Sequence, residues 1–277
     1  MFRQFVHTIG SVALLGLAVS LSACDGMTVT IDGEKAVPLD KLDLSGPPPE
    51  TVAVVGPDHV RLTEGDKLAI TVDGPAKDKV RFVRHDGKLS ITREPHSYGG
   101  VDLIGGNSDG AAATVTVTMP APRAVTIAGS GSLDAPRLAG PKTKITVAGS
   151  GTVSVARVET DRLKVDLAGS GSAKAAGHAK ALDLTIAGSG SADLAGLRVD
   201  GADATIAGSG KAAFASDGQV KGTILGSGEV RVTGRATCKV TTLGSGRLVC
   251  DSGPAAAASG GADEAGDAAD KDDDKDD

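Results

Sequence analysis

Large aromatic side chains are nearly absent from this 277-residue sequence, which has no Trp, one Tyr and four Phe. A compact globular core normally relies on such side chains, because each of them buries a large apolar area. Here Val, Ile, Leu and Ala must form the core, and they are accompanied by 39 glycines. The composition therefore predicts a thin, extended core.

Cysteine and histidine are also scarce, with three Cys and five His in the chain. The histidines do not pair with one another or with Cys at metal-ligand spacing. The sequence contains no G-x-S-x-G elbow, no Cys–His arrangement, no G-x-G-x-x-G and no Walker motif. We therefore expect no enzyme, no cofactor, no metal site and no nucleic-acid partner.

The apolar run at residues 8–20 is too short to span a bilayer as a helix. It follows Arg3 and leads to LSAC at residues 21–24, which resembles the lipobox of bacterial lipoproteins. The resemblance implies a signal peptide over 1–23 and lipidation of Cys24, with acyl chains such as palmitate anchoring the protein to a membrane. Asp25 resembles an inner-membrane retention signal, which would place the chain on the periplasmic side. An ordinary signal peptide is the alternative.

The other end of the chain, residues 253–277, consists mainly of Ala, Gly and Asp. It carries nine acidic residues and two lysines, and so accounts for the acidity of the whole chain, whose formal net charge is −6. Such a segment repels itself and cannot bury apolar area. We predict a disordered acidic tail, with loose divalent-cation binding as the alternative.

The tripeptide Gly-Ser-Gly occurs seven times, at intervals of 18 to 20 residues. Its glycines are Gly129, Gly131, Gly149, Gly151, Gly169, Gly171, Gly188, Gly190, Gly208, Gly210, Gly226, Gly228, Gly244 and Gly246. A period near 20 over seven copies is typical of a solenoid, in which each copy forms one coil.

Alignment of the copies gives two apolar columns that flank a polar column rich in Thr. The residues two before the first Gly are Ile127, Val147, Leu167, Ile186, Ile206, Ile224 and Thr242, and those four before it are Val125, Ile145, Val165, Leu184, Ala204, Gly222 and Val240. This alternation indicates a half-buried strand, and it resumes after the glycines. We predict an all-β fold, a parallel β-helix with about 18–20 residues per coil. A β-sandwich with antiparallel strands is the alternative.

The glycines themselves have a structural interpretation as turn residues. A tight corner requires positive φ angles, which Gly adopts without steric cost. The serines between them, from Ser130 to Ser245, would then line one edge of the stack. The alternative, a phosphate cradle, would have to lead into a helix N-terminus, and no helical pattern follows any copy.

Charged residues form a further column, five before the first Gly. It contains Ala124, Lys144, Lys164, Asp183, Asp203, Lys221 and Lys239. We predict a solvent-facing stripe that either contacts an anionic polymer or keeps the surface soluble. Asp183 and Asp203, with Asp193 between them in sequence, are the best candidates for the carboxylate cluster of a carbohydrate-active enzyme, and surface solubility is the alternative explanation.

Residues 51–123 read as degenerate coils that precede the regular repeats at 124–252. Val52, Val54 and Gly56 match the columns of the Gly-Ser-Gly copies. Residues 94–113 have no period and many glycines, and they contain Tyr98. We predict a loop that leaves the solenoid at 94–113, and loops on rigid scaffolds are frequent binding sites.

Two cysteines remain if Cys24 is lipidated. Cys238 and Cys250 belong to the last coil and fall in inward-pointing columns. An oxidising envelope compartment permits a disulfide that holds the end of the solenoid together. Two buried free thiols are the alternative.

The lipobox, the strands at 52–92, the TVTVTMPAP run at 114–122 and the AGSGS repeats together resemble a bacterial family. It is the "putative auto-transporter adhesin, head GIN domain" family, formerly a domain of unknown function, and the resemblance covers residues 42–251. It implies a right-handed parallel β-helix and an adhesin-like role, and supplies no functional residues. We therefore expect a signal peptide (1–23), a lipidated Cys24 with a linker (24–50), a solenoid domain (51–252) and an acidic tail (253–277).

This organisation favours a non-catalytic envelope protein that acts by adhesion or scaffolding. A module that binds envelope glycan is the second hypothesis, and a carbohydrate-active enzyme is the third. The expected partners are a membrane, through the lipid anchor, and an envelope glycan or another envelope protein.

Overall fold

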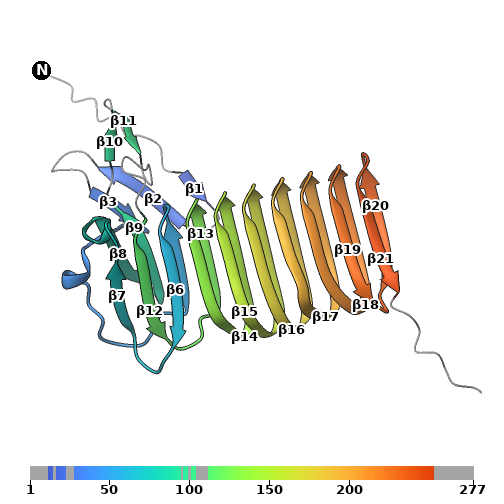
Figure 1. The fold of residues 1–277 in the computed structure, drawn as a ribbon, viewed down its shortest axis with the longest axis horizontal. Coiled ribbons are helices and arrows are strands. Elements are labelled where there is room, and N and C mark those ends of the chain that lie inside the picture. The colour runs from blue at the N-terminus through green and yellow to red at the C-terminus, as the bar shows by residue number, and fades with distance from the viewer. Residues whose placement is uncertain are drawn as a thin grey trace, which may run out of the picture.

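The computed structural model describes residues 12–14, 17–22, 28–94, 96–98, 101–103 and 112–252. Parallel coils stack into a β-solenoid of about six turns, as predicted (Figure 1). The described residues contain two short 3-10 turns, η1 (Leu39–Lys41) and η2 (Lys77–Lys79), and no α-helix. No helix among them is long and apolar enough to cross a membrane.

The regular part of the solenoid consists of nine strands. They are β13 (Ala124–Gly129), β14 (Ser132–Gly149), β15 (Thr152–Gly169), β16 (Ser172–Gly188), β17 (Ser191–Gly208), β18 (Lys211–Gly226), β19 (Glu229–Gly234), β20 (Thr237–Leu243) and β21 (Arg247–Ser252). Neighbours pair in parallel, and residues of the same column lie side by side, as Ile145, Val165 and Leu184 do. The predicted columns are confirmed, and this one-coil stacking rules out the antiparallel β-sandwich.

The core is a stack of small apolar side chains. Val125, Ile145, Val165, Leu184 and Ala204 are each at most 2% exposed. Since each of them packs on its equivalent one coil away, the core extends along the solenoid without any large aromatic cluster, as the composition predicted. In the last coil, Val240 of the same column is 45% exposed, because no described residue lies beyond it.

The two glycines of each corner are required for different reasons. The first has a positive φ, as at Gly149 (112°) and Gly169 (111°), which only Gly adopts readily. The second does not have a left-handed φ, so the prediction was wrong for it. A Cβ at Gly151 would instead lie 2.6 Å from Ile127 Cγ2 and 2.7 Å from the Gly131 carbonyl oxygen. The second glycine is therefore required by the close approach of the preceding coils.

The serine of each corner is exposed, from Ser130 to Ser245. Its contribution to the stack comes from the backbone, since the Ser150 N–H donates to the Gly129 carbonyl at 3.0 Å and the Ser170 N–H donates to Gly149 at 3.0 Å. The hydrogen-bond ladder thus continues around the corner, and the serine hydroxyl is left facing solvent.

The N-terminal end of the solenoid has a different chain path. Its strands are β5 (Thr51–Val55), β6 (His59–Glu64), β7 (Ala69–Asp73), β8 (Val80–His85), β9 (Lys88–Arg93) and β12 (Thr114–Met119). Strands β5 and β6 pair in parallel with β13 and β14, as the column match predicted. On their other side lie β9 and β12, also parallel. Finally β7 and β8 run antiparallel to β12 and β9 and close this end.

Residues 94–113 lie between β9 and β12, at the place where a regular coil has Gly-Ser-Gly. We call this segment the corner insertion. Its described part includes an antiparallel pair, β10 (His96–Tyr98) and β11 (Val101–Leu103). The predicted loop thus replaces one corner of the solenoid, and its ends belong to two strands of the same coil.

A small antiparallel sheet precedes the solenoid. It contains β1 (Val12–Leu14), β2 (Leu17–Ser22), β3 (Thr28–Ile31) and β4 (Glu34–Lys35). Val29 and Ile31 of β3 are buried against Val55 and Val83, so the β3–β4 hairpin is attached to the solenoid. Cys24 lies outside the described residues, and cleavage before it would remove β1 and β2 and leave this hairpin.

The terminal coil, formed by β20 and β21, contains a disulfide. Cys238 and Cys250 are bonded, with their Cα atoms 6.6 Å apart. Both residues are partly buried against the core. The bond joins the two strands that have no further coil to pack against.

We expect Gly169→Ala to destabilise the fold. The new Cβ would lie 2.5 Å from the Gly149 carbonyl oxygen at a φ of 111°, and such strain costs about 1–3 kcal/mol before any clash is counted. The matched change Ser170→Ala should stay within about 0.5 kcal/mol of the original chain. Urea denaturation measures both, and equal losses would contradict the assignment of the corner.

Candidate binding surfaces

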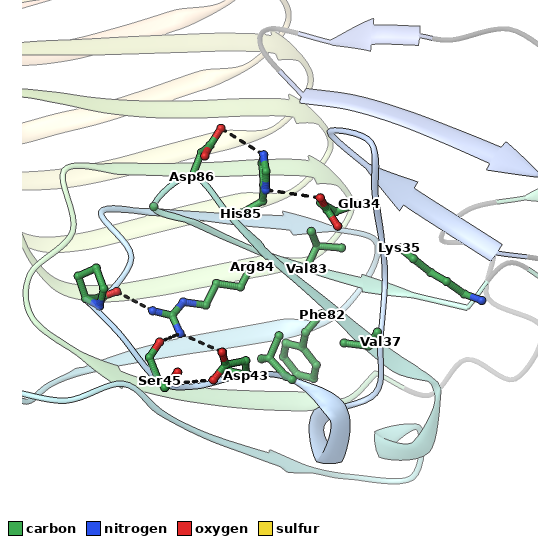
Figure 2. A pocket seen from close by; sticks show the side chains of 13 residues that line it. Glu34, Lys35, Val37, Asp43, Ser45, Phe82, Val83, Arg84, His85 and Asp86 are labelled. Carbon is green, nitrogen blue, oxygen red and sulfur yellow. Dashed lines mark hydrogen bonds and ion pairs between the residues drawn. The ribbon is translucent and has the colours of Figure 1, made fainter.

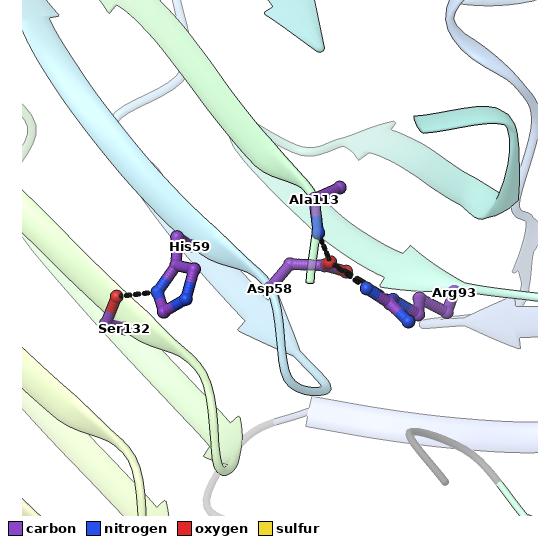
Figure 3. Close-up of polar contacts among 5 residues, drawn as sticks. All are labelled: Asp58, His59, Arg93, Ala113 and Ser132. Atoms are coloured by element: carbon purple, nitrogen blue, oxygen red, sulfur yellow. Dashed lines mark hydrogen bonds and ion pairs between the residues drawn. The ribbon is translucent and has the colours of Figure 1, made fainter. Parts of the chain in front are cut away.

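The corner insertion is closed at its base by a buried ion pair. Asp58, which takes the place of the second corner glycine in the β5–β6 coil, is 1% exposed. Its carboxylate accepts a hydrogen bond from Arg93 Nε at 2.9 Å and another from the Ala113 N–H at 2.8 Å (Figure 3). Because Arg93 ends β9 and Ala113 precedes β12, Asp58 holds the two ends of the insertion together.

The residue next to Asp58 takes part in a second polar contact. His59 Nδ1 lies 2.6 Å from Ser132 Oγ on the neighbouring coil (Figure 3). A Ser–His pair would require a carboxylate to orient the imidazole for nucleophilic catalysis. The adjacent carboxylate, Asp58, is instead engaged by Arg93 and Ala113. The arrangement is therefore a surface contact between coils.

The carboxylates that the sequence singled out do not form one cluster. Asp183 and Asp203 are neighbours in register, but Asp183 accepts a hydrogen bond from Arg162 at 2.7 Å. Asp193 follows a corner, in a different column, and pairs with Lys174 at 3.6 Å. Within the described part of the chain, no group of three His, Cys, Asp or Glu side chains could hold a metal ion.

The predicted charged stripe is a true column of the solenoid. Lys144, Lys164 and Asp183 are aligned in register, and Asp203, Lys221 and Lys239 continue the column. Lys144 and Lys164 both pair with the carboxylate of Asp166, at 3.4 and 3.3 Å. Much of the positive charge at this end of the stripe is thus neutralised within the solenoid.

A second outward column contains hydroxyl groups. His59, Ser132, Thr152 and Ser172 are aligned along it, and Ser172 Oγ donates a hydrogen bond to Thr152 Oγ1 at 3.1 Å. Further along, the same column changes to Lys211, Glu229 and Arg247. The surface therefore varies from neutral and polar to charged along the solenoid axis.

A hollow of about 450 Å³ opens on this charged part, and we call it the Ala213 hollow. It forms because Ala213 is flanked in its column by the longer side chains of Asp193 and Arg231. Lys211 and Glu229 complete its charged lining, together with the hydroxyl of Ser191. Such a mixture of donors and acceptors is suited to a polar ligand.

The carboxylate of Glu229, beside this hollow, is contacted by two guanidinium groups. Hydrogen bonding from the Arg247 guanidinium, at 3.1 Å, holds the pKa of Glu229 below its ordinary value. Arg231 contacts the same carboxylate at 3.4 Å. Lys211 forms no ion pair within the described residues, so its ammonium group is available to an anionic ligand.

Another hollow, of about 400 Å³, lies between β8 and the segment around η1 (Figure 2). Phe82 and Val37 contribute apolar surface to it. Arg84 donates hydrogen bonds to the carbonyl oxygens of Asp43, at 2.9 Å, and Pro47, at 2.6 Å. Because these bonds hold the segment that follows η1 in place, the guanidinium of Arg84 has a structural role.

On the rim of this second hollow His85 lies between two carboxylates. Its Nε2 is 3.2 Å from Asp86 and its Nδ1 is 3.7 Å from Glu34 of β4 (Figure 2). Asp32, in the turn before β4, also pairs with Lys88 at 2.8 Å. These contacts attach the β3–β4 hairpin to the β8–β9 pair and explain the charged rim.

Sequence reasoning missed the Asp58 clamp and the Ala213 hollow. A signal existed for each, because Asp58 breaks the glycine rule of the corner and Ala213 is a small residue between Asp193 and Arg231 in its column. Neither signal identified its partners, which come from other coils.

The chain resembles known proteins in both sequence and structure. The family model "putative auto-transporter adhesin, head GIN domain" matches residues 48–236. A putative adhesin from Bacteroides fragilis aligns with a TM-score of 0.64 at 18% identity, covering 73% of this chain and 92% of that one. A putative lipid binding protein from Parabacteroides distasonis gives 0.56 at 18% identity, with coverages of 74% and 93%. A putative adhesin from the same species gives 0.53 at 21% identity, with coverages of 74% and 94%.

At these identities the likeness to the solved structures shows the fold alone. No curated protein sequence is significantly similar to this chain.

We expect Arg93→Met to be strongly destabilising. It would leave the carboxylate of Asp58 buried without its charge partner, which costs about 3–5 kcal/mol. The control is Arg157→Met, which removes an exposed pair with Glu159 and should cost at most about 1 kcal/mol. Thermal and urea unfolding distinguish the two, and a similar small loss for both would show that the clamp does not stabilise the fold.

Proposed function

Because this chain belongs to the putative auto-transporter adhesin, head GIN domain family, we propose that it is a lipid-anchored envelope protein that acts by surface contact. The lipid is attached at Cys24, and the solenoid extends from the membrane on the periplasmic side. Its partner is an envelope glycan or another envelope protein.

The observation that carries this proposal is the regular outer surface of the solenoid. Outward columns run through successive coils in register, so the chain presents long, straight rows of polar groups on a rigid support. Such extended surfaces are what solenoids use for binding. Two of the three candidate carboxylates contribute to pairs within the solenoid, Asp183 with Arg162 and Asp193 with Lys174.

The position of the anchor fits this role. The β3–β4 hairpin begins four residues after Cys24 and is attached to the N-terminal end of the solenoid by buried apolar contacts and by the Asp32–Lys88 pair. A short connection from the lipid to a docked hairpin would hold that end near the membrane. The opposite end, at β20 and β21, would then project away from it (Figure 1).

Glycan binding is the second candidate, and the Ala213 hollow favours it. The hollow combines a free ammonium group, two carboxylates, a guanidinium and a hydroxyl around a small floor. An acidic saccharide would place its carboxylate at Lys211 and its hydroxyls near Asp193 and Ser191. Aromatic stacking would be absent, because no aromatic residue lines the hollow, so the expected affinity is low and depends on salt.

We expect lipidation to require Cys24. Cells that express the chain should incorporate labelled palmitate into it and retain it in the membrane fraction, whereas Cys24→Ser should abolish both. Cys238→Ser is the matched control, because that residue lies in the solenoid, and it should keep the label. Unlabelled wild-type chain would overturn the anchoring.

A filled Ala213 hollow should no longer bind glycan. The glutamine side chain of Ala213→Gln would point outward and leave the core intact. We expect this variant to lower the affinity for acidic envelope saccharides at least tenfold in calorimetric titration. Ser154→Gln, in the same outward column on a different coil, is the control and should bind normally. Equal binding by both variants would remove the hollow from consideration, and no binding by wild type would leave protein contact as the function.

A further inference from the structure

The two ends of the solenoid differ in how they are closed. At the N-terminal end, β7 and β8 run antiparallel to the strands beneath them and end the parallel stack. At the other end, the terminal coil pairs on one side only, β20 with β18 and β21 with β19. Within the described residues nothing pairs with its outer edges. Two strands thus present free backbone N–H and C=O groups.

This open end also exposes core residues. Val240 is 45% exposed, although its equivalents in the same column are at most 2% exposed. Natural proteins usually protect such edges with prolines, bulges or several charges. Strand β20 contains one charged residue, Lys239, and no proline. The end therefore has the properties of a surface that is covered in the functional state.

A second copy of this chain is the partner that fits the end. The terminal coil of one copy cannot extend the N-terminal end of another in the same parallel register, because the antiparallel strands β7 and β8 occupy that end. Two terminal coils can meet each other around a two-fold axis across the strands, which pairs β20 with β20 and β21 with β21, each antiparallel. Such a contact is closed and does not propagate into fibres.

The charges of β21 support one register. Arg247, Val249 and Asp251 share the outward face, since side chains alternate along a strand. An antiparallel pair centred on Val249 places Arg247 of each copy opposite Asp251 of the other. Asp251 is exposed and forms no ion pair within the described residues, so it is available for this contact. Opposite charges facing each other across strands are stabilising.

Strand β20 can also pair with its own copy in an antiparallel register. Centred on Val240, it places Val240 against its copy and Lys239 opposite Thr241. The exposed core residue is then covered, and no two lysines face each other directly. The disulfide between Cys238 and Cys250 joins the two edges of each copy to each other.

We propose that the protein binds a second copy of itself, terminal coil to terminal coil, through antiparallel pairing of β20 and β21. In combination with the proposed function, on which this step rests, the two lipid anchors lie at opposite ends of the dimer. Copies anchored in two membranes that face the same compartment then contact each other at their distal ends, and the contact is homophilic adhesion.

Charge exchange tests the register in solution. The full chain carrying Cys24→Ser, which removes the lipid site, should sediment as a dimer at micromolar concentration. Asp251→Lys and Arg247→Glu should each weaken self-association at least tenfold, because each brings like charges together. An equimolar mixture of the two should restore the dimer, since every facing pair is then of opposite sign. A monomeric wild type, unaffected variants or a mixture that stays monomeric would each overturn the proposal.

Folding controls accompany these variants. Arg247 also pairs with Glu229 at 3.1 Å, so Arg247→Glu could disturb the terminal coil, whereas Asp251→Lys has no such partner to lose. Circular dichroism and thermal unfolding should match wild type for Asp251→Lys. Deletion of residues 253–277 should retain the dimer, and its loss on deletion would assign the contact to the tail instead.

Vesicle tethering separates this inference from the proposed function. Vesicles that carry the lipidated wild-type chain should aggregate, those with Asp251→Lys should not, and a mixture with Arg247→Glu vesicles should aggregate again. A solution dimer without vesicle aggregation would overturn adhesion through the anchor and leave the self-association standing. Absence of both would overturn the homophilic contact while leaving lipidation of Cys24 to its own test.

Discussion

The structure depends on the close stacking of one backbone corner on the next. Coils of a parallel solenoid are separated by the spacing of hydrogen-bonded strands, about 4.8 Å, and the chain must turn at that spacing without a side chain in the way. The Ser150 and Ser170 N–H groups bond to the glycine carbonyl of the preceding coil, and the second glycine leaves space for the side chain of that coil's strand. This stacking of corners aligns equivalent residues of successive coils in columns. It also keeps the core thin enough for small residues to fill.

Much of this could be predicted from the sequence because stacking makes a local pattern repeat. Ile127, Val147 and Leu167 recur at the same place in each copy, and their alternation with polar residues indicates both the strands and their buried face. The chain path at the N-terminal end could not be predicted, since the columns say which residues are equivalent and not which coil is adjacent in space. Strand β9 packs in parallel beside β5, with Lys88 opposite Thr51, although β6, β7 and β8 lie between these two strands in the sequence.

The polar surfaces were less predictable for a physical reason. A hydrogen bond or a hollow depends on neighbours one coil away, which the sequence separates by 18 residues or more. The lysine stripe was visible as a column, but the pairing of Lys144 and Lys164 with Asp166 required knowledge of side-chain direction. In the same way, Asp58 reads as one more polar residue in a turn, and only the arrangement of β9 and β12 shows that Arg93 and Ala113 converge on it.

The stacking of one repeat per coil from β14 to β18 has a consequence for how this molecule can change. Because one repeat adds one coil and one coil adds a fixed rise of about 4.8 Å, gain or loss of a whole repeat alters the length of the rod and leaves both of its ends as they were. In the proposed anchored arrangement, the number of repeats therefore sets the distance between the membrane and the terminal coil. Duplication or deletion of whole repeats during evolution would change the length of the solenoid in equal steps and leave both ends unchanged.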